Sequence, residues 1–278
     1  MTTVTEYYGV EPHFCEWNYI QGVIKELDFD NDTQLHVVSM TQEWDFCDKV
    51  VLDKNKRNVI IGLADEFMTD NVPQEWKDNA TTFKAYLQPT QECSSVHSFP
   101  LGYNKKHLKL ISRPIKDRPI DVFFAGHMAS VNRQRYMRPV IDFFMTMSSD
   151  KRPKVEIDIS KGFNMGLDGD TYSEKLHGSK VVVCPAGNVS METFRHYEAM
   201  RSGAVIVSPK LPETKIYNKA AICQVDDWNG NVGNTIMDLL SDLDMLQLIQ
   251  DRQQQTYNNR FTAKSVAKYI NELLPVTK

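Results

Sequence analysis

Short runs of apolar residues, separated by polar loops, recur along the chain and predict the strands of an α/β protein. The clearest run covers residues 180–184, which are rich in valine, and it stops at Pro185. Parallel strands that are buried on both faces have this unbroken apolar pattern. Similar runs predict further strands at 35–40, 58–63, 83–87, 96–101, 120–125, 155–159, 204–208 and 222–225.

Residues at helical spacing predict the elements between and after these strands. They indicate helices at 17–27, 132–148, 171–177, 232–257 and 262–274. The segment after the strand at 180–184 predicts one more helix, with Ser190 as its N-cap and Gly203 as its left-handed stop. Strand, glycine-containing loop, helix and second strand in this order form the crossover unit of a parallel sheet.

The length of the chain and the order of its elements predict two domains. A chain of 278 residues is long for one core and comfortable for two. The segment 113–119 places two prolines around charged residues, which is typical of a linker. We therefore expect an α/β fold with two Rossmann-like domains that face a cleft, at residues 1–115 and 116–278.

Composition and charge narrow the class of protein. Apolar residues make up 41% and charged residues 24% of the chain, as in soluble globular proteins. No apolar run approaches the roughly 20 residues that span a bilayer, and the N-terminus lacks the basic and apolar regions of a signal peptide. We therefore expect a cytoplasmic protein. The five cysteines are scattered without metal-ligand spacing, which predicts reduced thiols.

The helix predicted to begin at Ser190 is a candidate anion site. A helix that follows a parallel strand points free N–H groups and its positive dipole end toward the crevice where such folds bind ligands. Glu192, Arg195 and Glu198 recur every third residue and would share one side of this helix. The arginine could bind a diphosphate, and one of the carboxylates could bind the hydroxyls of a ribose. Alternatively, the three residues form ordinary ion pairs on a solvated face.

Several residues of this region resemble, in order and spacing, the nucleotide-sugar site of exostosin-type glycosyltransferases. They are Tyr172-Ser173, Ser179-Lys180, Cys184-Pro185, Gly187, Ser190, Arg195, Glu198-Ala199 and Gly203. The segments 99–103 and 121–126, with Arg133 and Arg135, extend the resemblance to about residues 97–208. Ala186 departs from it, because this family commonly has arginine or lysine there.

The resemblance implies the two-domain GT-B fold, with the C-terminal helix bracing the first domain. The second domain would bind the donor, and the first domain would bind the acceptor. The implied reaction is the transfer of a sugar, with inversion, from a nucleoside diphosphate sugar, by analogy a UDP-sugar. Enzymes of this fold generally need no metal ion, so no metal and no other cofactor are expected, and the pair Asp168 and Asp170 is interpreted as a turn and helix cap.

The residues expected to bind the donor lie in the second domain. They are Arg195, Glu198, Ser190, Glu192, Thr193, Gly187, Asn188, Arg133, His127 and Gly126. Gly126 and His127 are placed in the loop after the strand at 120–125.

An inverting transferase needs a general base within reach of the acceptor hydroxyl. Asp65 and Glu66 follow a predicted buried strand, which would put them at the ligand edge of the sheet. They are the first candidates, with His13 and Glu43 behind them. The alternative for each is a strand-end cap or a surface pair.

The acceptor is suggested by a basic stretch at 104–119. It includes Lys105 and Lys106, expected on the acceptor side, with Lys109, Arg113, Lys116 and Arg118. With the short chain, it favours a relative of phage enzymes that glycosylate a hydroxymethylated pyrimidine in double-stranded DNA, in the host cytoplasm. Glycan and small-molecule acceptors stay open, and the stretch could be merely a solvated face. A non-catalytic nucleotide-sugar-binding module is a second class. A dinucleotide-dependent oxidoreductase is disfavoured because GxGxxG is absent.

Overall fold

The computed structural model describes residues 4–41, 44–64, 71–104, 113–162 and 165–274. The chain divides into two compact units. The N-terminal unit consists of Met1–Lys105, Pro212–Asn218 and Asn259–Lys278, and the C-terminal unit of Lys106–Leu211 and Lys219–Asn258. The last part of the chain therefore returns to the N-terminal unit. Among the helices of the described residues, none is both long enough and apolar enough to cross a membrane.

The N-terminal unit is built on five parallel strands in the order β1-β2-β4-β5-β6, and β3 pairs antiparallel with β2. The strands are β1 (Val4–Tyr8), β2 (Thr33–Thr41), β3 (Trp44–Asp45), β4 (Arg57–Leu63), β5 (Ala80–Lys84) and β6 (Val96–Ser98). The sequence did not predict β1, because Thr5 and Glu6 interrupt the apolar residues of this edge strand. Two predicted strands are also shifted or shortened: 83–87 is observed at 80–84, and 96–101 ends at Ser98.

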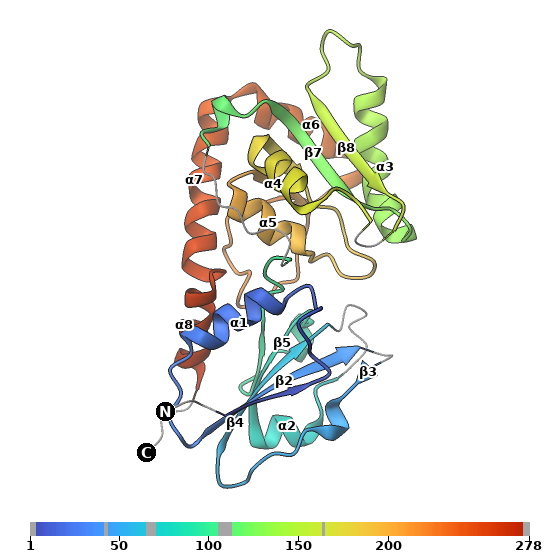
Figure 1. Cartoon of the computed structure of the whole chain (residues 1–278). Helices are drawn as coiled ribbons and strands as arrows, with labels where there is room; N and C mark the ends of the chain where they lie inside the picture. The colour runs from blue at the N-terminus through green and yellow to red at the C-terminus, as the bar shows by residue number, and fades with distance from the viewer. Residues whose placement is uncertain (1–3, 42–43, 65–70, 105–112, 163–164, 275–278) are drawn as a thin grey trace. The chain divides into compact units, whose positions relative to one another are not determined.

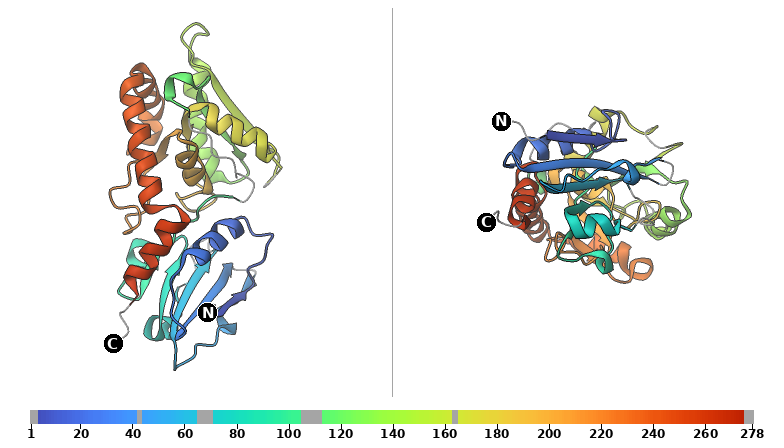
Figure 2. Two further views of the ribbon diagram at one scale, coloured as in Figure 1. Left: turned by 60° about the vertical axis from the view of Figure 1, so that its left-hand side comes forward. Right: turned by 90° about the horizontal axis from the view of Figure 1, so that it is seen from below.

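Helices cover both faces of this sheet. On one face, α1 (Trp17–Glu26) packs beside α8 (Ala263–Leu273) over a core that includes Val37, Ile61 and Phe83 (Figures 1 and 2). On the other face, Trp76 of α2 (Gln74–Asn79) joins a second core. The Tyr19 hydroxyl donates to the Phe261 carbonyl oxygen at 2.8 Å, which ties α1 to the residues before α8. The prediction that the C-terminal helix braces the first domain is confirmed.

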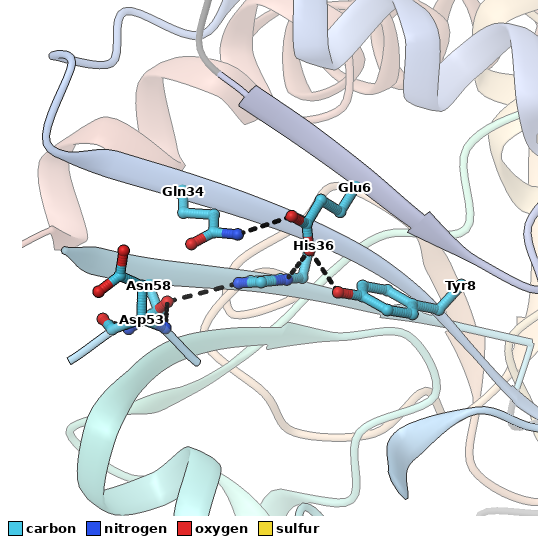
Figure 3. A network of polar contacts seen from close by, with 6 residues as sticks. All are labelled: Glu6, Tyr8, Gln34, His36, Asp53 and Asn58. Atoms are coloured by element: carbon cyan, nitrogen blue, oxygen red, sulfur yellow. Dashed lines mark hydrogen bonds and ion pairs between the residues drawn. The ribbon is translucent and has the colours of Figure 1, made fainter. Parts of the chain in front are cut away.

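A polar network lies among β1, β2 and the start of β4 (Figure 3). His36 is fully buried between Glu6, whose Oε2 is 3.4 Å from Nδ1, and Asn58, whose Oδ1 is 3.4 Å from Nε2. Glu6 also accepts hydrogen bonds from the Tyr8 hydroxyl and, at 2.9 Å, from Gln34 Nε2. Burial lowers the pKa of His36. His36 and Asn58 lie in the amino-terminal halves of β2 and β4, away from the edge where parallel sheets bind ligands.

The C-terminal unit is built on a second parallel sheet, in the order β11-β10-β9-β7-β8. Its strands are β7 (Ile120–His127), β8 (Val155–Ser160), β9 (Ser179–Val183), β10 (Val205–Pro209) and β11 (Cys223–Val225). From β7, the chain first adds β8 on one side and then β9 on the other. The strand order therefore reverses between β7 and β9.

Helices also cover both faces of this second sheet. One face packs on α3 (Val131–Thr146) and α6 (Trp228–Ser241), with Met137, Val140 and Trp228 in the core. The other face is covered by α4 (Gly169–Gly178) and α5 (Phe194–Ser202) (Figure 1).

The single long helix predicted at 232–257 is observed as two helices. They are α6 and α7 (Leu243–Arg260), separated at Asp242. Asp242 has an extended backbone, and its carboxylate accepts from the Met245 N–H at 2.9 Å. The aspartate therefore ends one helix and caps the next.

The segment predicted as a linker packs partly into the C-terminal unit. It forms a short 3₁₀ helix, η3 (Ile115–Asp117), and the next residue, Arg118, is 2% exposed. The Arg118 guanidinium donates to the carbonyl oxygens of Ser179 and Ser202, both at 2.9 Å, and of Arg113 at 3.0 Å. The assignment of Arg118 to an exposed basic surface is therefore wrong, because its donors join the start of β9 to the end of α5.

Candidate functional site

The carboxyl ends of β7 and β9 mark the position where the C-terminal unit could bind a ligand. The strand order of this sheet reverses between these two strands. The connections that follow β7 and β9 therefore run in opposite directions. In open α/β sheets, such a reversal leaves a crevice at the carboxyl ends of the strands. Helix α3 follows β7 and α5 follows β9, so both helices begin at this edge.

Helix α5 begins three residues later than the sequence predicted. Ser190 is buried in a turn, where its carbonyl oxygen accepts from the Gly187 N–H at 2.6 Å and its hydroxyl accepts from the Glu192 N–H at 3.1 Å. Thr193 is the N-cap, and it forms a capping box with His196. The helix starts later because the Ser190 hydroxyl accepts a hydrogen bond within its own turn and does not cap the helix. Thr193 caps it instead. Gly203, with φ of 75°, ends the helix as predicted.

His196 fixes the first turn of α5 and was not singled out by the sequence. Its Nδ1 accepts from the Thr193 N–H at 3.2 Å, and its Nε2 lies 2.8 Å from Ser208 Oγ. Because the Ser208 hydroxyl donates to Pro209, Nε2 must donate to Ser208, so the ring is neutral. Burial lowers the pKa of His196 to about 3, which keeps this anchor neutral at physiological pH.

Arg195 lies in the first turn of α5 and reaches the carboxyl end of β7. The residue is 9% exposed, and its guanidinium donates to the Ala125 carbonyl oxygen and lies 4.5 Å from the centre of the Phe124 ring. Its Nε is buried and has no hydrogen-bond partner among the described residues. Arg195 is thus a cation at the positive end of a helix, with part of its donor capacity unused.

Arg133, in the first turn of α3, reaches the same end of β7. Its Nη1 donates to the His127 carbonyl oxygen at 2.9 Å, and its Nε donates to the Ala186 carbonyl oxygen at 3.3 Å. His127 is the last residue of β7 and not part of the following loop as predicted, because the strand pairs with β8 as far as Ser160. The two arginines therefore bind carbonyl oxygens that lie two residues apart on one strand.

Gly126 lies between these two carbonyls and makes room for Arg195. A Cβ atom at this position would lie 2.5 Å from Arg195 Nη2 and 3.3 Å from Phe124. No side chain larger than hydrogen fits unless the guanidinium moves. The glycine thus positions Arg195.

Glu198 lies one turn further along α5. It is 6% exposed, and its Oε2 accepts a hydrogen bond from the Tyr172 hydroxyl of α4 at 2.9 Å. Burial and the Glu198 charge raise the pKa of Tyr172 well above its usual value, so the phenol stays a donor. Tyr172 belongs to the motif that suggested the family, but its role in holding Glu198 could not be predicted without the packing of α4 on α5.

The remaining predicted donor residues lie in or next to the loop before α5. Glu192 precedes the helix and accepts from the Tyr197 hydroxyl, so the prediction that it shares one helix side with Arg195 and Glu198 is wrong. Asn188 is exposed and Thr193 is the buried N-cap. The structure therefore brings Arg195, Arg133 and Gly126 together and places Glu192 elsewhere.

Most of the predicted catalytic and acceptor residues are not described by the structure. Asp65, Glu66, Glu43, Lys105 and Lys106 lie outside the described residues. His13 is exposed in the segment between β1 and α1, with its Nδ1 3.3 Å from the Glu11 carboxylate.

The pair Asp168 and Asp170 is a helix cap, as predicted. The Asp168 carboxylate accepts from the N–H groups of Asp170 and Thr171 at the start of α4. Within the described ranges, no group of three His, Cys, Asp or Glu side chains could hold a metal ion.

Comparisons with known proteins identify the fold. No family model matches the sequence, and no curated protein matches it either. Among solved structures, the Anabaena protein HepE in complex with UDP gives a TM-score of 0.55 at 10% identity and covers 98% of this chain and 99% of its own. Sucrose-phosphate synthase from Thermosynechococcus elongatus gives 0.54 at 12%, over 87% of this chain and 72% of that one. A glycosyltransferase from Rickettsia africae gives 0.51 at 11%, over 95% and 82%.

These likenesses cover nearly the whole chain and show its fold. Together with the two parallel sheets, they show that the chain has the GT-B fold of two Rossmann-like domains. The resemblance to exostosin-type enzymes in particular stays a prediction.

Proposed function

We propose that the chain is a glycosyltransferase that moves a sugar from a UDP-sugar to an acceptor hydroxyl by inverting, in-line displacement. The observation that carries this proposal is Arg195, a buried arginine in the first turn of α5 at the switch point of the sheet. A cation there is disfavoured by the helix dipole. A bound diphosphate at the start of α5 would offset that cost.

The other groups of this edge fit a nucleotide diphosphate lying along α5. Glu198, held by Tyr172, presents a carboxylate that can accept hydrogen bonds from ribose hydroxyls. During transfer, negative charge grows on the diphosphate as the sugar leaves. The N-terminus of α5 and the Arg195 guanidinium would stabilise that charge. Uridine is proposed from the family resemblance, and the similar protein HepE was solved with UDP.

Titration calorimetry with UDP and UDP-glucose tests the donor site. The wild type should bind, and Arg195→Ala should weaken binding about 10- to 100-fold, because a charge-assisted hydrogen bond contributes roughly 1.5–3 kcal/mol. Arg201→Ala is the matched control, since Arg201 lies in the last turn of the same helix. Equal weakening by both variants would contradict the assigned role of Arg195. Failure of the wild type to bind either nucleotide would contradict the proposed function.

For the acceptor, we propose a hydroxymethylated pyrimidine in double-stranded DNA, on the strength of the basic stretch at 104–119. Within its described part, Arg113 and Lys116 are exposed, and Arg118 is buried and adds no surface charge. Duplex DNA should bind with an affinity that falls steeply as salt is added, because phosphate contacts release counterions. Transfer of labelled glucose to hydroxymethylated duplex, but not to unmodified duplex, would support this acceptor. Transfer only to glycans or small molecules would contradict the DNA acceptor. Donor binding without turnover would indicate a non-catalytic module.

A further inference from the structure

Glu16 occupies the ligand edge of the N-terminal unit. It directly precedes α1, and α1 follows the parallel strand β1, so the start of this helix lies at the carboxyl edge of the sheet. Tyr19, Ile20 and Val23 are fully buried and follow Glu16 by three, four and seven residues. Side chains at this spacing share one face of a helix. Glu16 therefore lies on the face of α1 that covers the sheet, and it is itself only 6% exposed.

The Glu16 carboxylate has no partner that would explain its burial. The residue stands at the N-cap of α1 but makes no side-chain cap hydrogen bond. Among the residues that the structure describes, no other side chain bonds or pairs with it. Burying a carboxylate without a partner is costly, and the group responds by holding its proton more tightly. Burial accordingly raises the pKa of Glu16 to about 7, and only its own N–H opposes this.

A second polar group lies buried on the same side of the sheet. Ser39 is fully buried in the carboxyl-terminal half of β2, and its hydroxyl has no hydrogen-bond partner in the described part of the chain. Leu35, Val37 and Ser39 are spaced two residues apart, so their side chains lie on the same face of β2, and Leu35 and Val37 belong to the core under α1. Two buried polar side chains with few hydrogen bonds thus lie toward one edge and on one face of this sheet. Such groups are the expected lining of a polar ligand site.

The surroundings hold this part of α1 rigidly. The Tyr19 ring occupies the space beside Gly102, where a Cβ atom would lie 2.1 Å from the ring. Gly102 also has φ of 69°, which favours glycine. With the Tyr19 hydroxyl bound to Phe261, the helix that carries Glu16 is fixed between the sheet and the C-terminal residues. Reacting groups need such fixed supports.

Glu6 in the same unit shows what a structural carboxylate looks like (Figure 3). It accepts hydrogen bonds from Tyr8 and Gln34 and lies beside His36. It is also partly exposed, with 39% of its side chain accessible. Glu16 is more deeply buried than Glu6 and has none of these contacts.

We propose that Glu16 is the general base that takes the proton from the acceptor hydroxyl, an assignment that rests on the proposed sugar transfer. The acceptor oxygen forms a bond to the anomeric carbon while the bond from that carbon to the diphosphate oxygen breaks. The hydroxyl proton passes to the Glu16 carboxylate, and the electron pair of the broken bond leaves with UDP. Ser39 contributes a hydroxyl that can bind a polar group of the acceptor.

The test measures transfer of glucose from UDP-glucose to hydroxymethylated duplex DNA and, without DNA, UDP release by hydrolysis. Glu16→Gln keeps the shape of the side chain but cannot take a proton, so kcat should fall about 10²- to 10⁴-fold. The dissociation constant for UDP should stay within about twofold of wild type, because donor binding is assigned to the C-terminal unit. Glu26→Gln, at the exposed far end of the same helix, is the control and should keep full activity.

The pH profile separates a base from a structural residue. In the wild type, kcat/KM should rise with pH and level off above about 7. Glu16→Gln should lose this rise, and Glu16→Asp should keep it at a lower rate. A wild type that turns over donor, beside a Glu16→Gln variant of equal activity, would overturn the assignment alone. A wild type that neither binds UDP nor releases it from UDP-glucose would instead remove the proposed function.

Discussion

The two ends of the β9–α5 crossover each hold a buried arginine, and the two arginines have different surroundings. At the end of α5, Arg118 donates to three carbonyl oxygens at 2.9–3.0 Å, where the helix dipole favours a cation. At the start of α5, Arg195 opposes the dipole and keeps a buried Nε without a partner in the described structure. Arg118 is therefore explained by the fold alone. Arg195 keeps donor capacity and an unfavourable position on the dipole that a bound anion would offset.

The N-terminal unit repeats this contrast with carboxylates. Glu6 lies among side-chain hydrogen-bond donors in the amino-terminal half of the sheet, and Glu16 lies buried at the carboxyl edge with only its own N–H as a donor. Within each of these two pairs, the residue with incomplete bonding is the one at the ligand edge. Other buried groups, such as Thr82 Oγ1 and Gln253 Nε2, also lack partners in the described structure, so incomplete bonding supports a site only together with a position at the ligand edge.

The largest effect on stability is expected from removing Arg118. Arg118→Ala should lower the free energy of unfolding by about 3–5 kcal/mol, because it leaves several buried carbonyl oxygens without donors. Arg113→Ala, an exposed neighbour, should change it by less than about 0.5 kcal/mol. Urea denaturation measures both. If Arg195→Ala destabilised the protein as much as Arg118→Ala, the distinction between the two arginines would be lost.

The next effect is pH-dependent and concerns Glu16. The folded protein keeps the Glu16 proton up to pH about 7, whereas the unfolded chain loses it near 4.5. The stability linked to this proton is present below pH 4.5 and is lost as the pH rises through 7. Glu16→Gln carries no charge, so between pH 4.5 and 8.5 it should gain about 3 kcal/mol of stability relative to wild type.

Denaturant unfolding at several pH values measures this difference. Glu26→Gln should show no such trend, since that side chain is exposed. If the difference in unfolding free energy between Glu16→Gln and wild type stays constant with pH, the Glu16 carboxyl has the same pKa in the folded and the unfolded protein. Such a result would also remove the reason to treat Glu16 as a base.

The sequence predicted the elements that are apolar and local. The valine-rich strand at 180–184 and the glycine stop at Gly203 are confirmed, because burial on both faces and a left-handed residue leave clear local patterns. The start of α5 was misplaced, since Ser190 and Thr193 are both good N-caps and only tertiary contacts choose between them. The break between α6 and α7 was missed because the helical pattern of the sequence continues through Asp242.

The candidate site was only partly predictable, for reasons of distance along the chain. Arg195 and Glu198 were found from spacing and family resemblance. Their supports, Gly126 and Tyr172, lie 69 and 26 residues away from the side chains they hold, and sequence spacing does not reveal such contacts. Glu16 gave no sequence signal, because a single glutamate before a helix is ordinary. Its burial and lack of partners become visible only when α1 is placed on the sheet.

A smaller effect, on binding only, is expected at Gly126. Gly126→Ala places a Cβ atom 2.5 Å from Arg195 Nη2, so the guanidinium must leave its position on the end of β7. UDP should then bind about 10-fold more weakly, as expected when one charge-assisted bond is lost, and stability should change little. Gly166→Ala is a control in the same unit, since its Cβ would lie 3.3 Å or more from other atoms. Unchanged UDP affinity in Gly126→Ala would show that the position of Arg195 does not matter for donor binding.

The smallest effect is expected at Tyr172, which supports Glu198 rather than Arg195. Tyr172→Phe removes the hydroxyl that donates to Glu198 Oε2 at 2.9 Å and leaves the ring beside Phe123. The carboxylate is then less well held, and affinity for UDP should fall by about 1 kcal/mol, or roughly fivefold. If Glu198 binds ribose hydroxyls, inorganic pyrophosphate, which has no ribose, should bind wild type and Tyr172→Phe equally well, whereas Arg195→Ala should weaken both ligands. Equal losses for UDP and pyrophosphate in Tyr172→Phe would show instead that Glu198 acts on the phosphate side, through its neighbour Arg195.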